Sequence, residues 1–467
     1  MTAAFSAVVF FEVPVFGVGV PLVVAWLVLG AVFCTLYFGF INVRGLPLSI
    51  RALRGDFHDP DAPGQITHFQ ALATAVSGTV GIGNIGGVAV AVAVGGLGAT
   101  FWMVVAGVLG MATKFAECTL GVRYRRENVD GTVSGGPMFY LSRGLTERGW
   151  PRVGKFMGGF YAVGIVIGCL GAGNMFQANQ AYVQLRAATG GDASPLDGYG
   201  WLVGILLALI VGGVILGGIT SIASVTDKLV PFMAILYVVG ALTVIGLHLE
   251  ALPAALSRIF EGAFTGEAAA GGAIGSMMIG MKRAVFSNEA GLGSASIAHS
   301  AVKTSLPATE GVVALFEPFI DTVVICTLSA LVIGVAQVTW PGFMDSGHEG
   351  VAMTSDAFGR TVSWFPIPLA VAAVLFAIST MISWAYYGLK GWAYLVGEGL
   401  RPRRIFSAVF CLFVAIGASI KLDAVLEFSD AAVFILCVPN VLGLVLLAPV
   451  VREELATLRA KAAALDE

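Results

Sequence analysis

The sequence predicts an all-α integral membrane protein with about eleven transmembrane helices in a single domain, 1–467. Three observations support this class. Of the 467 residues, 57% are hydrophobic and only 12% are charged, whereas soluble domains carry roughly 25% charged residues. The apolar residues gather in runs of about 20, the length that a helix needs to cross a bilayer. Two of these runs are interrupted by clusters of glycine, and helices broken in pairs characterise a small group of membrane folds.

The apolar runs give the order of the elements. The first predicted span covers roughly 18–42, and a polar amphipathic stretch at 44–66 follows it. The remaining predicted spans are roughly 67–93, 96–122, 153–185, 200–219, 228–248, 272–302, 310–336, 364–388, 404–421 and 427–449. The final residues, 450–467, are expected to form a short helical tail, and no soluble domain is expected.

Lysine and arginine predict the orientation, because loops on the cytoplasmic side carry an excess of them. With the N-terminus outside, most of the 26 Lys and Arg fall on the inner side. The exceptions are Arg186, Arg258, Arg360 and Lys421 outside, and Lys114, Lys282 and Arg283 within spans. The protein is therefore expected in the cell membrane, with its C-terminal tail in the cytoplasm and the lipid bilayer around it. The net charge of −3 indicates no nucleic-acid partner.

Two predicted spans contain breaks. Residues 77–87 read SGTVGIGNIGG, and residues 286–294 read FSNEAGLGS. Glycine at this density disfavours a continuous helix, and unwound backbone at membrane depth is tolerated only where protein, water or a ligand satisfies it. The breaks lie five spans apart, which predicts a five-plus-five inverted repeat with 67–248 as the first half and 272–449 as the second. The span at 18–42 is then an extra N-terminal helix.

Polar side chains in other spans are candidates for binding. Ser379, Thr380 and Ser383 lie on the ninth span, where hydroxyls facing unwound backbone would give the oxygen ligands that a hard cation such as Na⁺ prefers. Alternatively they hydrogen-bond carbonyls of their own helix. Gln177 could bind the amine or carboxylate of a substrate, or it could join two helices.

Charged residues inside the spans are candidates for ion coupling or for a structural network. Lys114 and Glu117 are three residues apart and are expected to pair with each other. Glu317 and Asp321 are four apart and share a helix face. Either could carry a coupling proton, or either could pair with Lys282 or Arg283.

No catalytic constellation is visible in the sequence. The histidines form no ligand-spaced cluster and receive no assigned chemistry, and the six cysteines lie in apolar runs without a CxxC pair. The protein is therefore expected not to be an enzyme and to need no organic cofactor. The oligomeric state stays open.

Five segments in order resemble the alanine or glycine:cation symporter family. They are GTVGIGNIGG at 78–87, GMATKFAE at 110–117, GGPMFY at 135–140, NMFQAN at 174–179 and KRAVFSNEAGLGS at 282–294. The resemblance spans nearly the whole chain. It implies a LeuT-type inverted-repeat fold with one extra N-terminal helix, and transport of alanine or glycine with Na⁺ or sometimes H⁺.

The resemblance also implies roles for individual residues. The first break would hold the substrate carboxylate on backbone N–H groups, and Phe286 and Trp384 would line the cavity. The implied substrate residues are Thr79, Gly81, Gly83, Asn84, Gln177, Phe286, Gly291 and Trp384. The implied Na⁺ ligands are Ser77, Val80, Ser379 and Thr380.

The function expected from the sequence is a secondary active symporter that carries a small neutral amino acid into the cell with Na⁺ by alternating access. Two alternatives stay open. One is a proton-coupled carrier of the same fold, and the other is an amino-acid sensor that does not transport.

Overall fold

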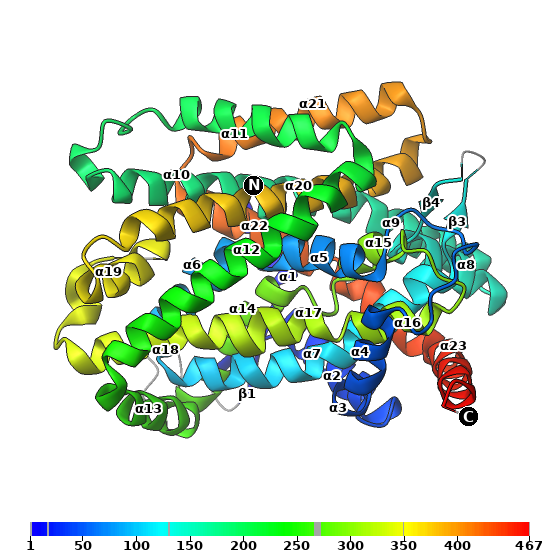
Figure 1. Ribbon diagram of the computed structural model, residues 1–467, viewed down its shortest axis with the longest axis horizontal. Helices are drawn as coiled ribbons and strands as arrows, with labels where there is room; N and C mark the ends of the chain where they lie inside the picture. The colour runs from blue at the N-terminus through cyan, green and yellow to red at the C-terminus, as the bar shows by residue number, and fades with distance from the viewer. Residues whose placement is uncertain (1, 16–17, 129–130, 266–271, 349, 467) are drawn as a thin grey trace.

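The structure, a computed structural model, describes residues 2–15, 18–128, 131–265, 272–348 and 350–466. It is a helical bundle with two short antiparallel hairpins at its edges (Figure 1). The elements up to the middle of the chain are α1 (Thr2–Val9), β1 (Glu12–Val15), β2 (Val18–Pro21), α2 (Leu22–Tyr37), α3 (Ile41–Arg44), α4 (Leu46–Arg54), α5 (His68–Thr79), η1 (Ile82–Asn84), α6 (Gly86–Gly95), α7 (Gly98–Arg123), β3 (Arg126–Glu127), β4 (Val133–Ser134), α8 (Pro137–Glu147), α9 (Pro151–Leu170), η2 (Gly171–Met175), α10 (Phe176–Ala188), η3 (Gly191–Ala193), α11 (Gly200–Ile215) and α12 (Gly218–Leu247).

The elements of the second half complete the bundle. They are η4 (Leu249–Ala251), α13 (Leu252–Phe264), α14 (Gly272–Asn288), α15 (Ala295–His299), α16 (Pro307–Val313), α17 (Phe316–Pro318), η5 (Phe319–Cys326), α18 (Thr327–Thr339), η6 (Phe343–Ser346), α19 (Val351–Thr361), α20 (Pro366–Val396), α21 (Leu400–Gly417), α22 (Leu422–Phe434) and α23 (Cys437–Ala464). The element η2 in the first half and the element η5 in the second half are π-helical.

Among the described residues, six helices are long and apolar enough to cross a membrane. The number rises to eight if each of two bent pairs counts as one span. Apolar side chains point outward on α11 and α12, for example Leu209 and Ile235, which are 68% and 63% exposed. Large exposed apolar surfaces are unfavourable in water and suit contact with lipid.

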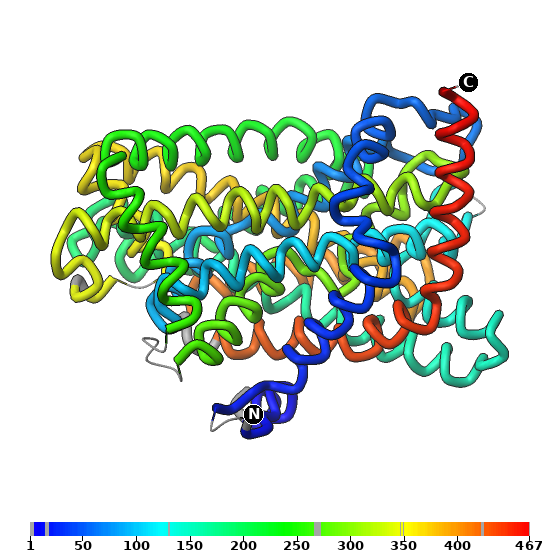
Figure 2. Tube along the Cα trace, turned by 90° about the horizontal axis from the view of Figure 1, so that it is seen from below, coloured from blue at the N-terminus to red at the C-terminus, as the bar shows by residue number. Residues whose placement is uncertain are grey.

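The bundle is layered, with α11 and α21 packed side by side above α10 and α20 (Figure 1). Below them α14 packs along α7, and α12 crosses the front of the molecule against α5 and α20. Seen from below, α23 crosses the other helices near the C-terminus, and the N-terminal segment lies at the lower edge of the bundle, where α1 packs against α22 (Figure 2). The two broken helices lie in the centre, where α6 packs against α14.

The predicted spans agree with the helices in order, but several boundaries differ. The first predicted span begins at 18, whereas α2 begins at Leu22, because Val18–Pro21 pairs with Glu12–Val15 in a hairpin. The span predicted at 228–248 begins earlier as α12 at Gly218, because a helix continues through polar residues when its other face is buried. The predicted tail at 450–467 continues α23 without a break to Ala464.

Three amphipathic helices were not predicted: α8, α13 and α19. They are too short and too polar to give a membrane-length apolar run. They pack along longer helices, α8 on α9, α13 on α7 and α18, and α19 on α18 and α6.

Backbone pairing joins the segment before α5 to the segment after α15. Gln65 N–H donates to Ala301 O at 2.7 Å, and Lys303 N–H donates to Ile66 O at 2.9 Å. The Arg125 guanidinium lies across this junction. It donates to the carbonyl oxygens of Pro63, Ser300, Val302 and Thr304.

Candidate functional site

The first break separates α5 from α6. The helix α5 ends at Thr79, Val80 is extended, and α6 leaves at 58° to α5. Two side-chain amides cover the freed backbone: Gly81 N–H donates to Asn84 Oδ1 at 2.8 Å, and Ile82 N–H donates to Gln177 Oε1 at 3.4 Å. The first hydrogen bond lies within the break, whereas the acceptor of the second, Gln177, lies on α10. The longer bond is weak, so Ile82 N–H is available to a stronger acceptor.

Oxygen atoms of α5 and α20 converge beside this break. Thr380 Oγ1 donates to Ser77 O at 3.0 Å, and Ser77 Oγ donates to Ser379 O at 2.7 Å. The Ser379 hydroxyl turns to Phe376 O of its own helix at 2.9 Å, and Ser383 Oγ donates to Thr74 O at 2.8 Å. All these side chains are buried. The resulting cluster of carbonyl and hydroxyl oxygens is the ligand type that hard cations bind.

The second break follows α14. Glu289, Gly291 and Gly293 all have positive φ, at 58°, 90° and 82°. The Glu117 carboxylate caps this turn, because its Oε1 accepts from Gly291 N–H at 2.9 Å and from Gly293 N–H at 3.1 Å. Asn440 donates to the same Oε1 at 2.7 Å and to Gly291 O at 2.8 Å.

A small buried cavity lies between the two breaks. It leaves about 20 Å³ for the centre of a water-sized molecule, and a site needs roughly 10–15 Å³ by this measure to hold one water. The conformation is therefore closed around the site. The lining residues are Gly78, Thr79, Gly83, Ala172, Gln177, Phe286, Ser287, Glu289, Trp384 and Val433.

The structure brings most of the predicted substrate residues together. Thr79, Gly83, Gln177, Phe286 and Trp384 line the cavity. A Cβ on Gly81 would lie 2.7 Å from Thr380 Oγ1, so Gly81 is at the junction between the cavity and the oxygen cluster.

Asn84 and Gly291 lie elsewhere. Asn84 Nδ2 donates to Asp321 Oδ1 at 2.5 Å, which joins the first break to η5. Gly291 faces Leu27 and Glu117, since a Cβ there would lie 2.3 Å from Leu27 Cδ2.

Glu289 also lines the cavity, although the sequence analysis assigned it no role in binding. Its Oε1 accepts from Trp384 Nε1–H at 2.8 Å, and its Oε2 accepts from the Ser294 hydroxyl. A signal was available in the sequence, because an acidic residue inside a glycine-rich break is a candidate for function.

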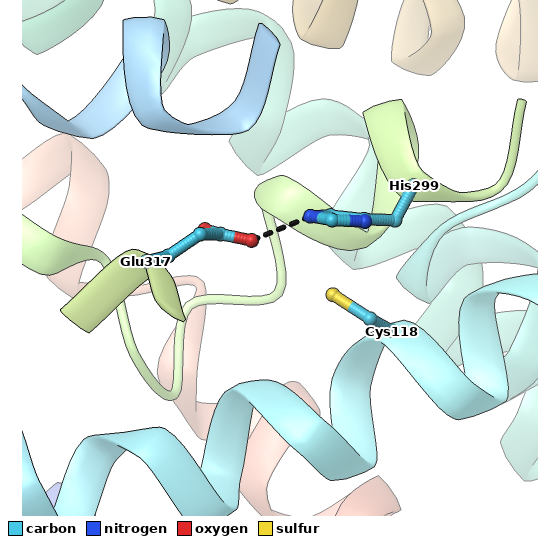
Figure 3. Close-up of side chains that lie close together, drawn as sticks. All are labelled: Cys118, His299 and Glu317. Atoms are coloured by element: carbon cyan, nitrogen blue, oxygen red, sulfur yellow. Dashed lines mark hydrogen bonds and ion pairs between the residues drawn. The ribbon is translucent and has the colours of Figure 1, made fainter. Parts of the chain in front are cut away.

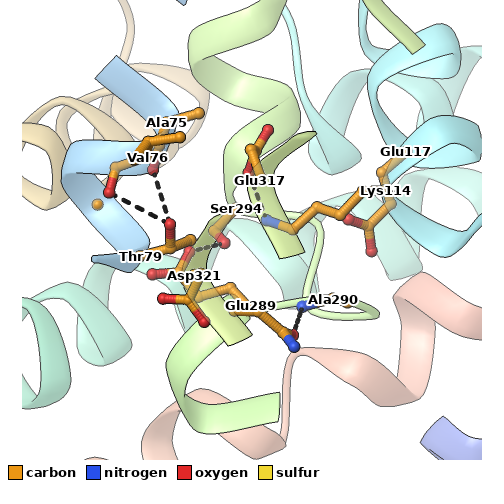
Figure 4. A network of polar contacts seen from close by, with 12 residues as sticks. Ala75, Val76, Thr79, Lys114, Glu117, Glu289, Ala290, Ser294, Glu317 and Asp321 are labelled. Carbon is orange, nitrogen blue, oxygen red and sulfur yellow. Dashed lines mark hydrogen bonds and ion pairs between the residues drawn. The ribbon is translucent and has the colours of Figure 1, made fainter. Parts of the chain in front are cut away.

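The predicted pairing of the buried charges was wrong. Lys114 Nζ pairs with Glu317 Oε2 at 3.0 Å rather than with Glu117 (Figure 4). Lys282 and Arg283 both pair with Asp430 Oδ2 at 3.0 Å, rather than with Glu317 or Asp321. Spacing along one helix cannot reveal partners from distant helices, and in both cases a distant carboxylate is the partner.

Two of the five histidines, His68 and His299, are also part of this network. His299 Nε2 contacts Glu317 Oε1 at 2.6 Å, and His299 Nδ1 contacts Glu310 Oε2 at 2.5 Å. The other oxygen of Glu310 contacts His68 Nδ1. This chain of contacts could not be predicted from the sequence, because its members lie on four different helices.

Cys118, His299 and Glu317 approach one another closely enough to suggest a metal site (Figure 3). However, both nitrogens of His299 face carboxylates, and Lys114 contacts the second oxygen of Glu317. A cation placed there would meet the Lys114 ammonium at short range and be repelled. The donor set therefore fits an internal ion-pair network better than a metal centre.

Comparisons with known proteins agree with these features. A family model described as the sodium:alanine symporter family matches residues 5–466. The sodium/alanine symporter AgcS of Methanococcus maripaludis is 39% identical over 426 residues, which cover 91% of each chain. The probable sodium/glutamine symporter GlnT of Bacillus subtilis is 32% identical over 422 residues, which cover 90% of this chain and 84% of GlnT. The structure of MhsT in complex with L-phenylalanine has a similar fold, with a TM-score of 0.59 at 16% identity over 83% of this chain and 89% of MhsT.

Proposed function

The chain belongs to the sodium:alanine symporter family, and on this premise we propose that it carries alanine or glycine into the cell together with Na⁺ by alternating access. The family and its curated relatives are symporters, so the protein is a multi-pass membrane transporter and not an enzyme. The chain is further proposed to have about eleven transmembrane spans, ten of which form a five-plus-five inverted repeat. It places the N-terminus outside and the C-terminus in the cytoplasm, because of the distribution of Lys and Arg.

The observation that carries the proposal is the position of a small cavity beside a cluster of oxygen atoms. The cavity lies between two broken helices, and Gly81 separates it from Thr380 Oγ1. A cavity this small must widen to admit any amino acid, and a substrate with a small side chain requires the least widening. We propose that the Na⁺ ligands are Ser77, Val80, Ser379 and Thr380. Ser383 Oγ, at 3.0 Å from Ser77 Oγ, stabilises this cluster.

The substrate is proposed to lie across the cavity with its carboxylate toward the first break. Ile82 N–H, which makes only a long bond to Gln177, is a donor for that carboxylate. Thr79, Gly81, Gly83, Gln177, Phe286 and Trp384 form the surrounding wall. Asn84 and Gly291 act indirectly, by fixing the shapes of the two breaks through Asp321 and Glu117. Na⁺ bound next to Gly81 orders the first break and so favours substrate binding, which is the coupling that symport requires.

A proton-coupled carrier is the second candidate, and one observation favours Asp321 in that role. Asp321 is fully buried and accepts hydrogen bonds from Asn84, Ser287 and Thr322, all of which are neutral. Glu317 is less suitable, because Lys114 and His299 both contact it.

Uptake of alanine into proteoliposomes tests the proposal. An inward Na⁺ gradient against K⁺, at equal pH on both sides, is expected to drive accumulation. Accumulation that ignores Na⁺ and follows an imposed pH gradient would transfer the coupling to protons. Binding of alanine without accumulation under either gradient would indicate a sensor.

A further inference from the structure

Glu289 is a buried carboxylate whose hydrogen bonds come only from neutral groups. It is 2% exposed and lines the cavity between the two breaks. Its donors are the Trp384 indole N–H and the Ser294 hydroxyl. Among the described residues, no Lys, Arg or His forms an ion pair with it.

The other carboxylates around the second break are compensated differently. Glu317 contacts the Lys114 ammonium and His299, and Glu310 lies between two histidines. Glu117 accepts from two backbone N–H groups and Asn440 at one end of the turn. Glu289 differs from all three because it lies at the cavity, where a ligand can reach it. Lys114 attracts Glu289 only from beyond ion-pair distance, because its ammonium contacts Glu317. A buried carboxylate without an opposite charge in contact is unfavourable, so a cation from outside would complete this site.

The backbone at Glu289 supports a role for its side chain. Its φ of 58° lies in the left-handed region, which non-glycine residues seldom occupy and which often marks functional sites. Gly291 and Gly293, in the same turn, reach positive φ with glycine. The backbone of Glu289 has a conformation that glycine would adopt more easily. The presence of glutamate there indicates that its side chain is needed.

The cavity has two chemically different ends. At the first break, the backbone of Gly83 and the Gln177 amide line the cavity, and Ile82 N–H lies beside them as a donor to Gln177 Oε1. On the second break, the Glu289 carboxylate presents acceptors. An amino-acid zwitterion carries a carboxylate and an ammonium on neighbouring atoms, and it matches these two ends when its carboxylate faces the first break.

We infer that the carboxylate of Glu289 binds the ammonium group of the amino-acid substrate and thereby selects for zwitterions over simple carboxylates. This inference rests on the proposed function. The bound ammonium supplies the missing positive charge. Trp384 holds the carboxylate in place, since its indole N–H lies 2.8 Å from Glu289 Oε1 and its ring packs against Gly173, where a Cβ would lie 2.1 Å from Trp384 Cγ. Trp384 is accordingly a positioning residue.

The experiment compares wild type with Glu289→Gln, which keeps the shape of the side chain and removes its charge. Calorimetry at saturating Na⁺ measures the dissociation constants of alanine and of propionate, which lacks the ammonium. In Glu289→Gln we expect the dissociation constant of alanine to rise at least about 30-fold, as for the loss of a buried charge pair. The value for propionate is expected to change less than about twofold, since that ligand never meets the charge. The exposed Glu250→Gln serves as the matched control and is expected to match wild type.

Unchanged alanine affinity in Glu289→Gln would overturn the inference. If uptake by that variant also no longer depends on pH, Glu289 is a proton carrier instead. If that variant moves fewer Na⁺ ions per alanine, the carboxylate binds a cation instead.

Two further measurements keep the test decisive. Thermal unfolding with and without Na⁺ shows whether Glu289→Gln is folded, and Glu289→Asp, which keeps the charge, is expected to bind alanine between the two extremes. If Glu289→Gln does not fold, the comparison of Glu289→Asp with wild type decides, because the shortened carboxylate must then weaken alanine binding and leave propionate binding unchanged. Wild type that binds alanine without Na⁺-driven uptake would contradict the proposed function and leave the affinity comparison valid. Wild type stabilised by no amino acid would overturn both.

Discussion

The side-chain hydroxyl of Thr380 on α20 donates a hydrogen bond to the main-chain oxygen of Ser77 on α5 across 3.0 Å. This contact connects the helix that breaks at Val80 to a helix that runs from Pro366 to Val396. A Na⁺ ion at this position would replace the hydrogen bond with two oxygen ligands and hold the same two helices together. Binding of Na⁺ at this position would therefore also fix the position of the break at Val80 relative to α20.

Thr380→Val is expected to weaken Na⁺ dependence, because it keeps the shape of the side chain and removes the hydroxyl oxygen. The Na⁺ concentration for half-maximal alanine uptake should rise about ten- to a hundredfold, the equivalent of one charge-assisted contact. Uptake measured across a series of Na⁺ concentrations checks this. Thr243→Val is the control, since that hydroxyl is exposed and bonds Val239 O of its own helix. An unchanged Na⁺ dependence would remove Thr380 from the site.

Gly81→Ala is expected to abolish uptake, while Gly87→Ala is expected to preserve it. A Cβ on Gly81 would lie 2.7 Å from Thr380 Oγ1 and 3.2 Å from Gln177 Oε1, whereas a Cβ on Gly87 meets nothing within 4 Å. The backbone of Gly81, with φ −135°, is accessible to alanine, so the effect is steric. Transport by both variants, at equal amounts in the membrane, would show that no close approach is needed at the break.

Lys114→Met and Glu317→Gln are each expected to destabilise the protein, because each leaves a buried charge without its partner. Breaking a buried ion pair costs about 3–5 kcal/mol. The double variant should recover part of this loss, since neither charge remains. Thermal unfolding in detergent, followed by tryptophan fluorescence, measures the loss of stability in the two single variants and in the double variant. If the two single effects simply add, Lys114 and Glu317 are not coupled.

Ala172→Val is expected to shift the preference from alanine toward glycine. Ala172 lines the cavity, which has room for about one water in the closed state. Two added methyl groups overfill it, at about 1–3 kcal/mol, and a substrate with a side chain suffers more than glycine. Competition of alanine and glycine for uptake measures the ratio. Ala187→Val, at an exposed position of α10, is the control, and an equal loss for both substrates would place Ala172 outside the substrate wall.

The broken helices were the most predictable part of this protein, and the contacts between them were the least. Glycine density located both breaks, because backbone conformation depends on local sequence. The partner of Lys114 could not be predicted, since Glu117 is near it along the helix while Glu317 meets it only through folding. For the same reason, Gly291 was expected at the substrate and faces Leu27 instead. The sequence shows that a turn needs glycine, but it does not show which side of the turn faces the ligand.

The Arg125 junction has a mechanical consequence. Its guanidinium binds one carbonyl from the segment before α5 and three from the segment after α15, and three backbone hydrogen bonds join the same segments. The N-terminal end of α5 and the C-terminal end of α15 are therefore held together and are expected to move as one rigid body. A cycle that swings one of them toward its open position must swing the other with it, so passage at that end is governed by one gate instead of two independent ones.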